Sequence, residues 1–264
     1  MKQASMAFLR SVLRSYDIEI LRYSTLQKLE ERIAACDLEL QLLHSLPGEH
    51  SASLLEYIHR SKSQLYQDLF ALAEVGFKTN GYFVEFGATD GIGHSNTYLM
   101  EKCFGWSGIL AEPAIRWHED LISNRKAHIE TCCVWSHSNK TLEFKEVDSP
   151  DLSTIDAFSL LGADQHRQAR NRGRVYEVRT ISLNDLLDKH HAPREIDYLS
   201  IDTEGSEFEI LNHFDFGRHS FKVITCEHNF SASREKIYDL LRRNGYVRKY
   251  EQLSKWDDWY VQSD

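Results

Sequence analysis

The sequence lacks several features that mark membrane, secreted or nucleic-acid-binding proteins. It has no uninterrupted apolar run of about 18 residues, so we expect no membrane span. The first five residues lack the apolar core of a secretory signal, and the five cysteines form no CxxC pair, which together predict reduced thiols in the cytoplasm. Positive charge is not in excess, because the formal net charge is −9, and this argues against nucleic acid as the main partner.

The stretch from residue 6 to residue 46 contains neither proline nor glycine, and its apolar residues recur at steps of three or four. This periodicity predicts one long amphipathic helix, or two in series. The steps from Tyr23 to Leu26 to Leu29 depart from a strict heptad repeat. Two interpretations stay open: a helix packed on its own domain, and a helix that joins copies of the chain into a homo-oligomer. We therefore divide the chain into an N-terminal helical region, residues 1–62, and a main domain, residues 63–264.

Strand-like and helix-like segments alternate in the main domain. Alternation of this kind predicts a mostly parallel sheet with helices on both faces. A short polar segment joins the last two strands, so we expect them to pair as an antiparallel hairpin. A Rossmann-like α/β fold whose mostly parallel seven-stranded sheet ends in such a hairpin is the layout of class I methyltransferases. The predicted strands lie near 82–86, 108–111, 128–134, 141–146, 174–180, 197–201, 221–226, 246–251 and 258–262.

A glycine-rich turn follows the first of these strands. The apolar run from Tyr82 ends at Glu85, and the turn continues through Gly87 and Asp90 to Gly91. Glycines permit close backbone approach and left-handed backbone conformations. Two carboxylates would repel a phosphate but suit ribose hydroxyls or a cationic ligand. The turn therefore predicts a nucleoside ligand without phosphates, of which S-adenosylmethionine is the obvious example.

Polar residues stand at the carboxyl end of every other strand that would meet this turn. In an open parallel sheet, ligands bind beyond these ends, near the topological switch point. Because five polar strand ends meet at one edge, we expect a functional site there. The other four ends are Glu112-Pro113, residues 132–136, residues 202–205 and residues 227–229.

Four segments together resemble the FkbM family of S-adenosylmethionine-dependent O-methyltransferases. They are residues 63–68 (SQLYQD), 83–91 (FVEFGATDG), 110–113 (LAEP) and 201–207 (IDTEGSE), and the similarity covers roughly residues 63–262. The family methylates hydroxyls of sugars and of natural products such as macrolides, so the resemblance implies a sugar or glycosylated acceptor.

The resemblance also implies roles for individual residues in cofactor binding. Asp202 would face the sulfonium and the acceptor hydroxyl. The methionine part would lie against Glu85, Gly87, Ala88 and Asp90, the ribose against Glu112 and Pro113, and the adenine against Cys133, Val134 and Trp135.

Methyl transfer to a hydroxyl requires positioning and removal of a proton, and therefore a base or a metal ion. His228, at the end of the fifth strand, is the predicted general base, with Asp202 and Glu204 beside it as catalytic candidates. Glu204 would orient the site, or would only favour the start of a helix. Asp202, Glu227 and His228 are also candidate ligands for Mg²⁺ or Mn²⁺, although a histidine is unusual for a hard cation, and a metal-free site stays open.

Residues 147–174 have few apolar positions and predict a long loop or small lid. Arg167 and Arg170 lie in it, and arginine clusters bind carboxylates and phosphates, so an anionic acceptor is one hypothesis. A solvated helix with scattered charges is the alternative.

Two other functions compete with methyl transfer. An NAD-dependent oxidoreductase is disfavoured because the turn reads GATDG rather than GxGxxG and carries Asp90 where a pyrophosphate would lie. A non-catalytic cofactor-binding scaffold, whose N-terminal helix recruits partners, is the other.

Overall fold

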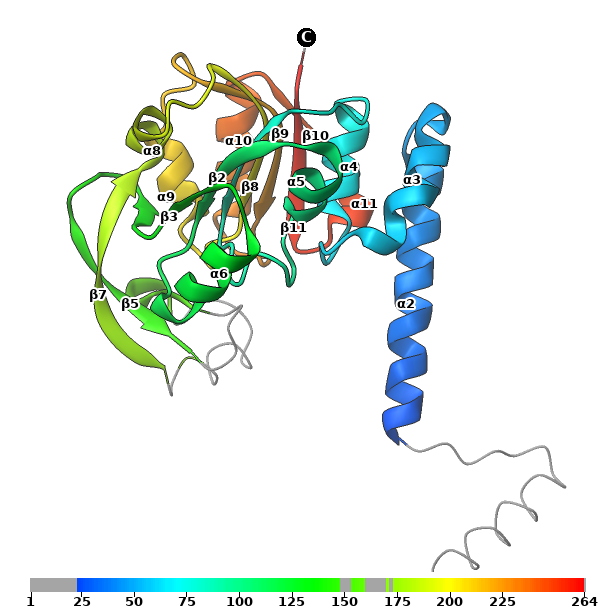
Figure 1. Cartoon of the computed structure of the whole chain (residues 1–264), viewed down its shortest axis with the longest axis horizontal. Helices are drawn as coiled ribbons and strands as arrows, with labels where there is room; N and C mark the ends of the chain where they lie inside the picture. Colours follow the sequence, from blue (N-terminus) through cyan, green and yellow to red (C-terminus); the bar gives the residue numbers. More distant parts are fainter. Residues whose placement is uncertain (1–22, 148–152, 160–169, 171–172, 264) are drawn as a thin grey trace, which may run out of the picture. The chain divides into compact units, whose positions relative to one another are not determined.

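The computed structural model describes residues 23–147, 153–159, 170 and 173–263 and divides the chain into two units, Met1–His44 and Ser45–Asp264 (Figure 1). In the first unit, α2 runs as a single helix over Tyr23–Ser45. The predicted helical segment before Tyr23 lies outside the described residues. Pro47 follows the helix end, where a proline cannot continue the helical hydrogen bonding. The predicted domain boundary at residues 62/63 stays a prediction.

The second unit is built on a seven-stranded sheet in the order β10-β11-β9-β8-β1-β2-β3. All neighbouring strands are parallel except β11, which runs antiparallel to both β9 and β10. This confirms the predicted fold class, including the terminal hairpin. The strands are β1 Tyr82–Phe86, β2 Ser107–Ala111, β3 His128–Glu130, β8 Glu195–Ile201, β9 Ser220–Glu227, β10 Tyr246–Lys249 and β11 Asp257–Gln262.

The strand order reverses direction at β1, which has β2 on one side and β8 on the other. From β1 the chain proceeds outward to β2 and β3, and it later returns to β8 and β9. The crevice beyond the carboxyl ends of β1 and β8 is therefore the topological switch point, where open parallel sheets bind ligands.

Helices cover both faces of the sheet, as a parallel sheet with two apolar faces requires (Figure 1). On one face, apolar residues of α8, α9 and α10 join the main core, with Leu186, Ile210 and Leu241 packed with Val84 and Leu199. On the other face, Phe70 of α4 stacks on Trp259 of β11 with ring centroids 4.7 Å apart. The α-helices in the described part of this unit are α3 Ser51–Tyr57, α4 Gln67–Glu74, α5 Tyr98–Phe104, α6 His118–Asn124, α8 Leu183–Lys189, α9 Glu207–Asn212, α10 Arg234–Arg243 and α11 Glu251–Ser254. No described helix has the length and apolar character needed to cross a lipid bilayer.

A second, four-stranded sheet differs from the sequence prediction. The strand expected over 128–134 is two strands in different sheets, because the carboxylate of Glu130 accepts a hydrogen bond from the backbone N–H of Cys132 (3.0 Å) and the chain turns there. The second sheet has the order β4-β7-β5-β6. Its strands are β4 Cys133–Trp135, β5 Thr141–Glu146, β6 Thr154–Ile155 and β7 Arg174–Ser182.

Candidate active site

A pocket opens at the switch point, between the turns that follow β1, β2 and β8 and the start of β4. Its walls combine apolar side chains, such as Phe86 and Val134, with the carboxylates of Glu112 and Asp202. Of the predicted cofactor-binding residues, those that line this pocket are Gly87, Glu112, Pro113, Cys133, Val134 and Asp202.

Gly87 lets two of these turns come into contact. Its φ is +74°, a left-handed conformation that favours glycine, and a Cβ atom there would lie 2.1 Å from the carbonyl oxygen of Asp202. The turn after β1 is therefore in direct contact with the turn after β8, and position 87 has no room for a side chain.

Glu112 is held with its carboxylate in the pocket. One oxygen accepts the backbone N–H of Thr89 and the other accepts that of Ala114, both at 2.8 Å. Burial raises the pKa of Glu112 to about 7. The carboxylate keeps lone pairs for further donors, as binding of two ribose hydroxyls requires.

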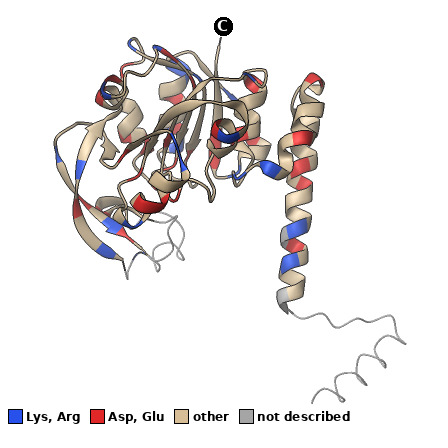
Figure 2. Cartoon of the chain, in the orientation of Figure 1, with Lys and Arg blue, Asp and Glu red and all other residues tan. Residues whose placement is uncertain are grey.

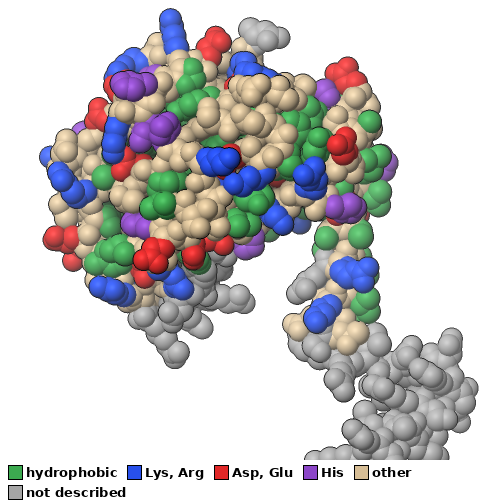
Figure 3. Space-filling view, viewed as in Figure 1, with side chains coloured by type: hydrophobic (Ala, Val, Ile, Leu, Met, Phe, Trp, Pro, Cys, Tyr) green, Lys and Arg blue, Asp and Glu red, His purple; other side chains and the backbone are tan. Residues whose placement is uncertain are grey.

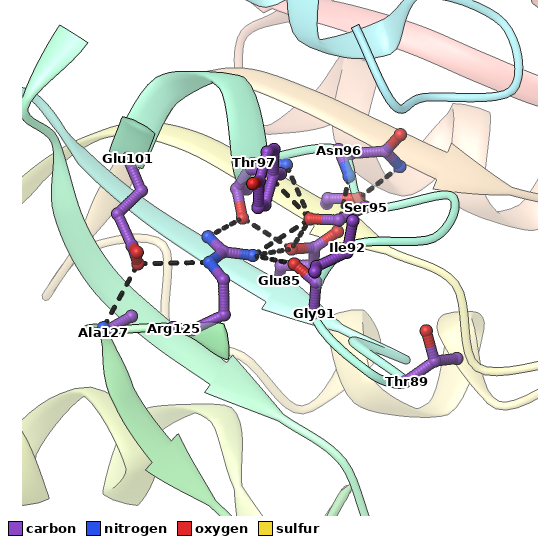
Figure 4. A network of polar contacts seen from close by, with 12 residues as sticks. Glu85, Thr89, Gly91, Ile92, Ser95, Asn96, Thr97, Glu101, Arg125 and Ala127 are labelled. Carbon is purple, nitrogen blue, oxygen red and sulfur yellow. Dashed lines mark hydrogen bonds and ion pairs between the residues drawn. The ribbon is translucent and has the colours of Figure 1, made fainter. Parts of the chain in front are cut away.

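Glu85 and Asp90 have other partners in the structure. The Glu85 carboxylate accepts hydrogen bonds from Ser95 Oγ, the Asn96 backbone N–H and Thr97 Oγ1, at 3.0, 2.6 and 2.5 Å (Figure 4). Asp90 Oδ1 accepts the backbone N–H groups of residues 92 and 93, both at 2.8 Å. Both carboxylates thus hold the loop after β1, and their contacts with the methionine part of the cofactor stay predictions.

Arg125 is the residue that sequence reasoning missed. Its side chain is fully buried and lies 3.8 Å from the Glu85 carboxylate (Figure 4). It also donates to Gly91 O, Thr97 Oγ1 and Glu101 Oε2, at 3.0, 2.9 and 3.2 Å. Although burial raises the pKa of Glu85, the Arg125 charge opposes that rise. Nothing in the sequence marked Arg125, which lies 40 positions after Glu85 and outside every motif.

Asp202 follows β8 and Glu227 ends the neighbouring parallel strand β9, so carboxylate oxygens of the two residues lie within 4.8 Å of one another. Burial raises both pKa values well above the usual range, and the charge of Glu204 adds to the rise at Asp202, as the charge of Asp202 does at Glu227. Two adjacent carboxylates with little access to solvent cannot both ionise at low cost, so loss of the second proton from the pair is disfavoured.

The carboxylates of Asp202 and Glu227 lie at the boundary between two cavities. Asp202 lines the pocket at the switch point, Glu227 lines a neighbouring cavity of about 230 Å³, and Glu204 lines both. Phe230 and Arg170 also line this second cavity. A molecule in the second cavity would therefore contact Glu227, next to a ligand in the pocket that contacts Asp202.

His228 makes backbone hydrogen bonds through both ring nitrogens. The backbone N–H of Phe230 donates to Nδ1 (2.9 Å), so the proton of a neutral ring lies on Nε2, which is 3.0 Å from the Asp257 carbonyl oxygen. Burial lowers the pKa of His228 and favours this neutral form. To act as a base or metal ligand, the imidazole would have to give up one of these bonds.

Among the residues that the structure describes, one group of side chains places metal-type ligand atoms within 4.8 Å of one another: Asp202, Glu204 and Glu227. Two of the three predicted ligands are in it, and Glu204 stands in place of His228. The Glu204 carboxylate also accepts from Arg170 (2.8 Å) and from the Asn229 side chain (3.2 Å), so a cation bound there would compete with a buried arginine.

The structure describes one of the two arginines that were predicted to bind the acceptor. Arg167 lies outside the described residues. The Arg170 side chain is almost fully buried against Glu204 at the wall of the second cavity.

The sheet order, the antiparallel β11 between β9 and β10, and the acid-lined pocket at the switch point define a class I methyltransferase. The family model described as the methyltransferase FkbM domain matches residues 85–248, more than half of the chain. The chain belongs to the FkbM methyltransferase family, as the four motifs predicted. Family membership implies S-adenosylmethionine as the methyl donor, and it does not support an NAD-dependent oxidoreductase.

Two solved structures are similar to the chain. A precorrin-6y C5,15-methyltransferase from Geobacter metallireducens GS-15 is 12% identical, with 75% of this chain and 87% of that chain covered and a TM-score of 0.39. A TehB-like SAM-dependent methyltransferase from Corynebacterium glutamicum is 7% identical, with 82% and 97% covered and a TM-score of 0.37. No curated protein matches the sequence.

Proposed function

We propose that the chain transfers a methyl group from S-adenosylmethionine to a hydroxyl of a sugar or glycosylated metabolite. The observation that carries this proposal is the close pair of Asp202 and Glu227, whose carboxylate oxygens lie within 4.8 Å of one another, one at the pocket and one at the adjoining cavity. A hydroxyl oxygen needs its proton removed as it attacks, and a carboxylate with a raised pKa suits that task near neutral pH.

When bound, S-adenosylmethionine supplies an electrophilic methyl group on a sulfonium cation. Transfer would form a carbon–oxygen bond to the acceptor as the carbon–sulfur bond breaks, and the residues of the chain would position the two partners. Glu227, on the acceptor side, takes the hydroxyl proton in its ionised form. Asp202, on the cofactor side, places negative charge toward the sulfonium. A positive charge bound beside the pair would lower the pKa of Glu227 and so favour its ionised form, which is the form that acts as a base.

The second cavity favours an acceptor without negative charge. Glu204, Glu207 and Glu227 all line it, and its one described arginine, Arg170, is ion-paired with Glu204. We therefore prefer a neutral or amine-bearing sugar over the anionic acceptor that the arginines first suggested.

Incubation with methyl-labelled S-adenosylmethionine and a panel of neutral sugars, aminosugars and sugar phosphates tests the proposal. Labelled methyl ethers of neutral sugars or aminosugars, detected by mass spectrometry, are the expected products. Transfer only to sugar phosphates would restore the anionic acceptor. Cofactor binding without transfer to any hydroxyl would favour a non-catalytic scaffold.

A divalent cation is the second candidate at the acidic group, with Asp202 and Glu227 as ligands. Carboxylate oxygens suit Mg²⁺ or Mn²⁺. Such an ion would replace a proton on the Asp202–Glu227 pair. We propose the metal-free form, because Arg170 already neutralises Glu204. Dialysis against EDTA should leave transfer unchanged, whereas loss of transfer that Mg²⁺ or Mn²⁺ restores would favour the metal-dependent form.

The pKa of Glu112 predicts that cofactor affinity depends on pH. Ribose hydroxyls donate to the ionised carboxylate, and the raised pKa, about 7, means that ionisation is incomplete below neutrality. The dissociation constant of S-adenosylhomocysteine should therefore fall by up to about tenfold per pH unit as pH rises toward 7, and then level off. In the Glu112→Gln variant, titrated by calorimetry at the same pH values, this pH dependence of the dissociation constant should be absent. An identical pH dependence in the variant would exclude Glu112 from ribose binding.

Phe230 is predicted to pack against the acceptor. It lies at the second cavity, the residue is 72% exposed, and its φ of +54° follows a φ of +44° at Asn229. Left-handed backbone at two successive non-glycine residues is strain of the kind that collects at functional sites. Phe230→Ala should raise KM for the acceptor by roughly 2- to 10-fold with unchanged affinity for S-adenosylhomocysteine, while Phe230→Tyr stays near wild type. Equal KM values in all three proteins would remove Phe230 from the acceptor site.

A further inference from the structure

Helix α2 carries an exposed apolar stripe along one side. Leu26, Leu29, Ile33, Cys36 and Leu40 follow one another at steps of three, four, three and four, and all five are exposed, with Ile33 at 68% and Leu40 at 55%. Figure 3 shows hydrophobic side chains recurring along this helix. This spacing is the a/d repeat of a coiled coil, with Leu26, Ile33 and Leu40 at a, and Leu29 and Cys36 at d. The irregular step at Tyr23 precedes it.

Such a helix gains little stability by itself, because most helical stability in proteins comes from packing of the apolar face. We propose that α2 pairs with α2 of a second copy of this chain, as a parallel, in-register two-stranded coiled coil.

The surface of α2 has the holes that this pairing needs. A hollow on the helix is lined by Leu29, Arg32, Ile33, Cys36, Asp37 and Leu40. In a parallel pair, each knob enters a hole of four residues on the facing helix. The residues at 29, 32, 33 and 36 form the hole for Ile33 of the second copy, and those at 33, 36, 37 and 40 form the hole for its Cys36. These two overlapping holes together make up the whole hollow.

The charges beside the stripe favour the parallel orientation. Arg32 occupies a g position and Asp37 the following e position, five residues later. A parallel pair brings each g residue of one helix beside the next e residue of the other. Arg32 of each copy therefore lies beside Asp37 of the other copy, which allows two symmetric ion pairs. Figure 2 shows basic and acidic residues interspersed along α2.

Cys36 gives a direct test with the full-length chain. In the parallel register the two Cys36 thiols face one another, within reach of a disulfide. Oxidation with copper phenanthroline should give a covalent dimer on non-reducing gels, and Cys36→Ser should abolish it. The matched control is Cys36→Ser with Ala35→Cys, which moves the thiol one position to the outer face and should not cross-link. Equal cross-linking through residues 35 and 36 would overturn the proposed register.

Sedimentation equilibrium tests the pairing of the two chains without a cross-linking reaction. The wild type should have twice the chain mass of 30.7 kDa. Ile33→Asp should raise the dimer dissociation constant at least about 100-fold, whereas Ala34→Asp, an exposed position off the stripe, should change it little. A monomeric wild type at tens of micromolar would overturn the proposal and favour packing of the helix on its own chain. An Ile33→Asp protein that still dimerises would place the interface elsewhere.

Discussion

Glu227→Gln is expected to lower kcat for methyl transfer by about 10²- to 10⁴-fold, the range that a general base contributes. Glutamine keeps the shape of the side chain but cannot accept the acceptor's proton. Affinity for S-adenosylhomocysteine should change little, because Glu227 lines the second cavity and not the cofactor pocket. The measurement is single-turnover transfer of a labelled methyl group, combined with calorimetric titration of the product.

Two comparisons separate this role from a structural one. Replacing Glu227 by the neutral glutamine should not lower the thermal midpoint above neutral pH, because the charge of Asp202 raises the pKa of Glu227 and disfavours its ionised form. His228→Gln should retain more transfer activity than Glu227→Gln, because both imidazole nitrogens already bond to the backbone. If His228→Gln abolishes transfer and Glu227→Gln does not, the base assignment returns to the histidine.

Gly87→Ala is expected to abolish measurable cofactor binding, with an increase of at least about 100-fold in the dissociation constant of S-adenosylhomocysteine. The new methyl group would lie 2.1 Å from the Asp202 carbonyl oxygen, on a backbone whose φ of +74° disfavours alanine. The turns after β1 and β8 would have to separate, and both line the cofactor pocket. Binding by calorimetry and thermal midpoint by differential scanning fluorimetry should both fall.

Gly93→Ala is the matched control for that variant. It lies six residues further along the same turn, but its added Cβ would approach no atom closer than 3.6 Å. Binding and thermal midpoint should stay near wild type. Wild-type cofactor binding in Gly87→Ala would show that the contact between the two turns is not needed for the pocket.

The sequence predicted the parts of the site that depend on local chain geometry. The glycine turn at Gly87, the carboxylate of Glu112 and the polar ends of β8 and β9 all follow from strands that end at one edge of a sheet. The structure brings these residues together at the pocket and the cavity, and their roles there stay predictions. The mostly parallel sheet and its hairpin followed from the same alternation of strands and helices.

The parts that could not be predicted depend on partners distant in the sequence. Glu85 was expected at the cofactor because it ends a strand beside glycines, but it is bonded to the segment 95–97 and paired with Arg125. The state of His228 depends on the Asp257 carbonyl, 29 residues away. Strand periodicity also does not say to which sheet a strand belongs, so β5 and β7 could not be assigned to the second sheet.

The central claim is that the pocket at the switch point binds the methyl donor. Calorimetric titration of the full-length chain with S-adenosylhomocysteine and, separately, with NAD tests it most directly. We expect one S-adenosylhomocysteine per chain, weaker binding by Glu112→Gln, and no heat of binding with NAD. Binding of NAD in the absence of any binding of S-adenosylhomocysteine would contradict the account.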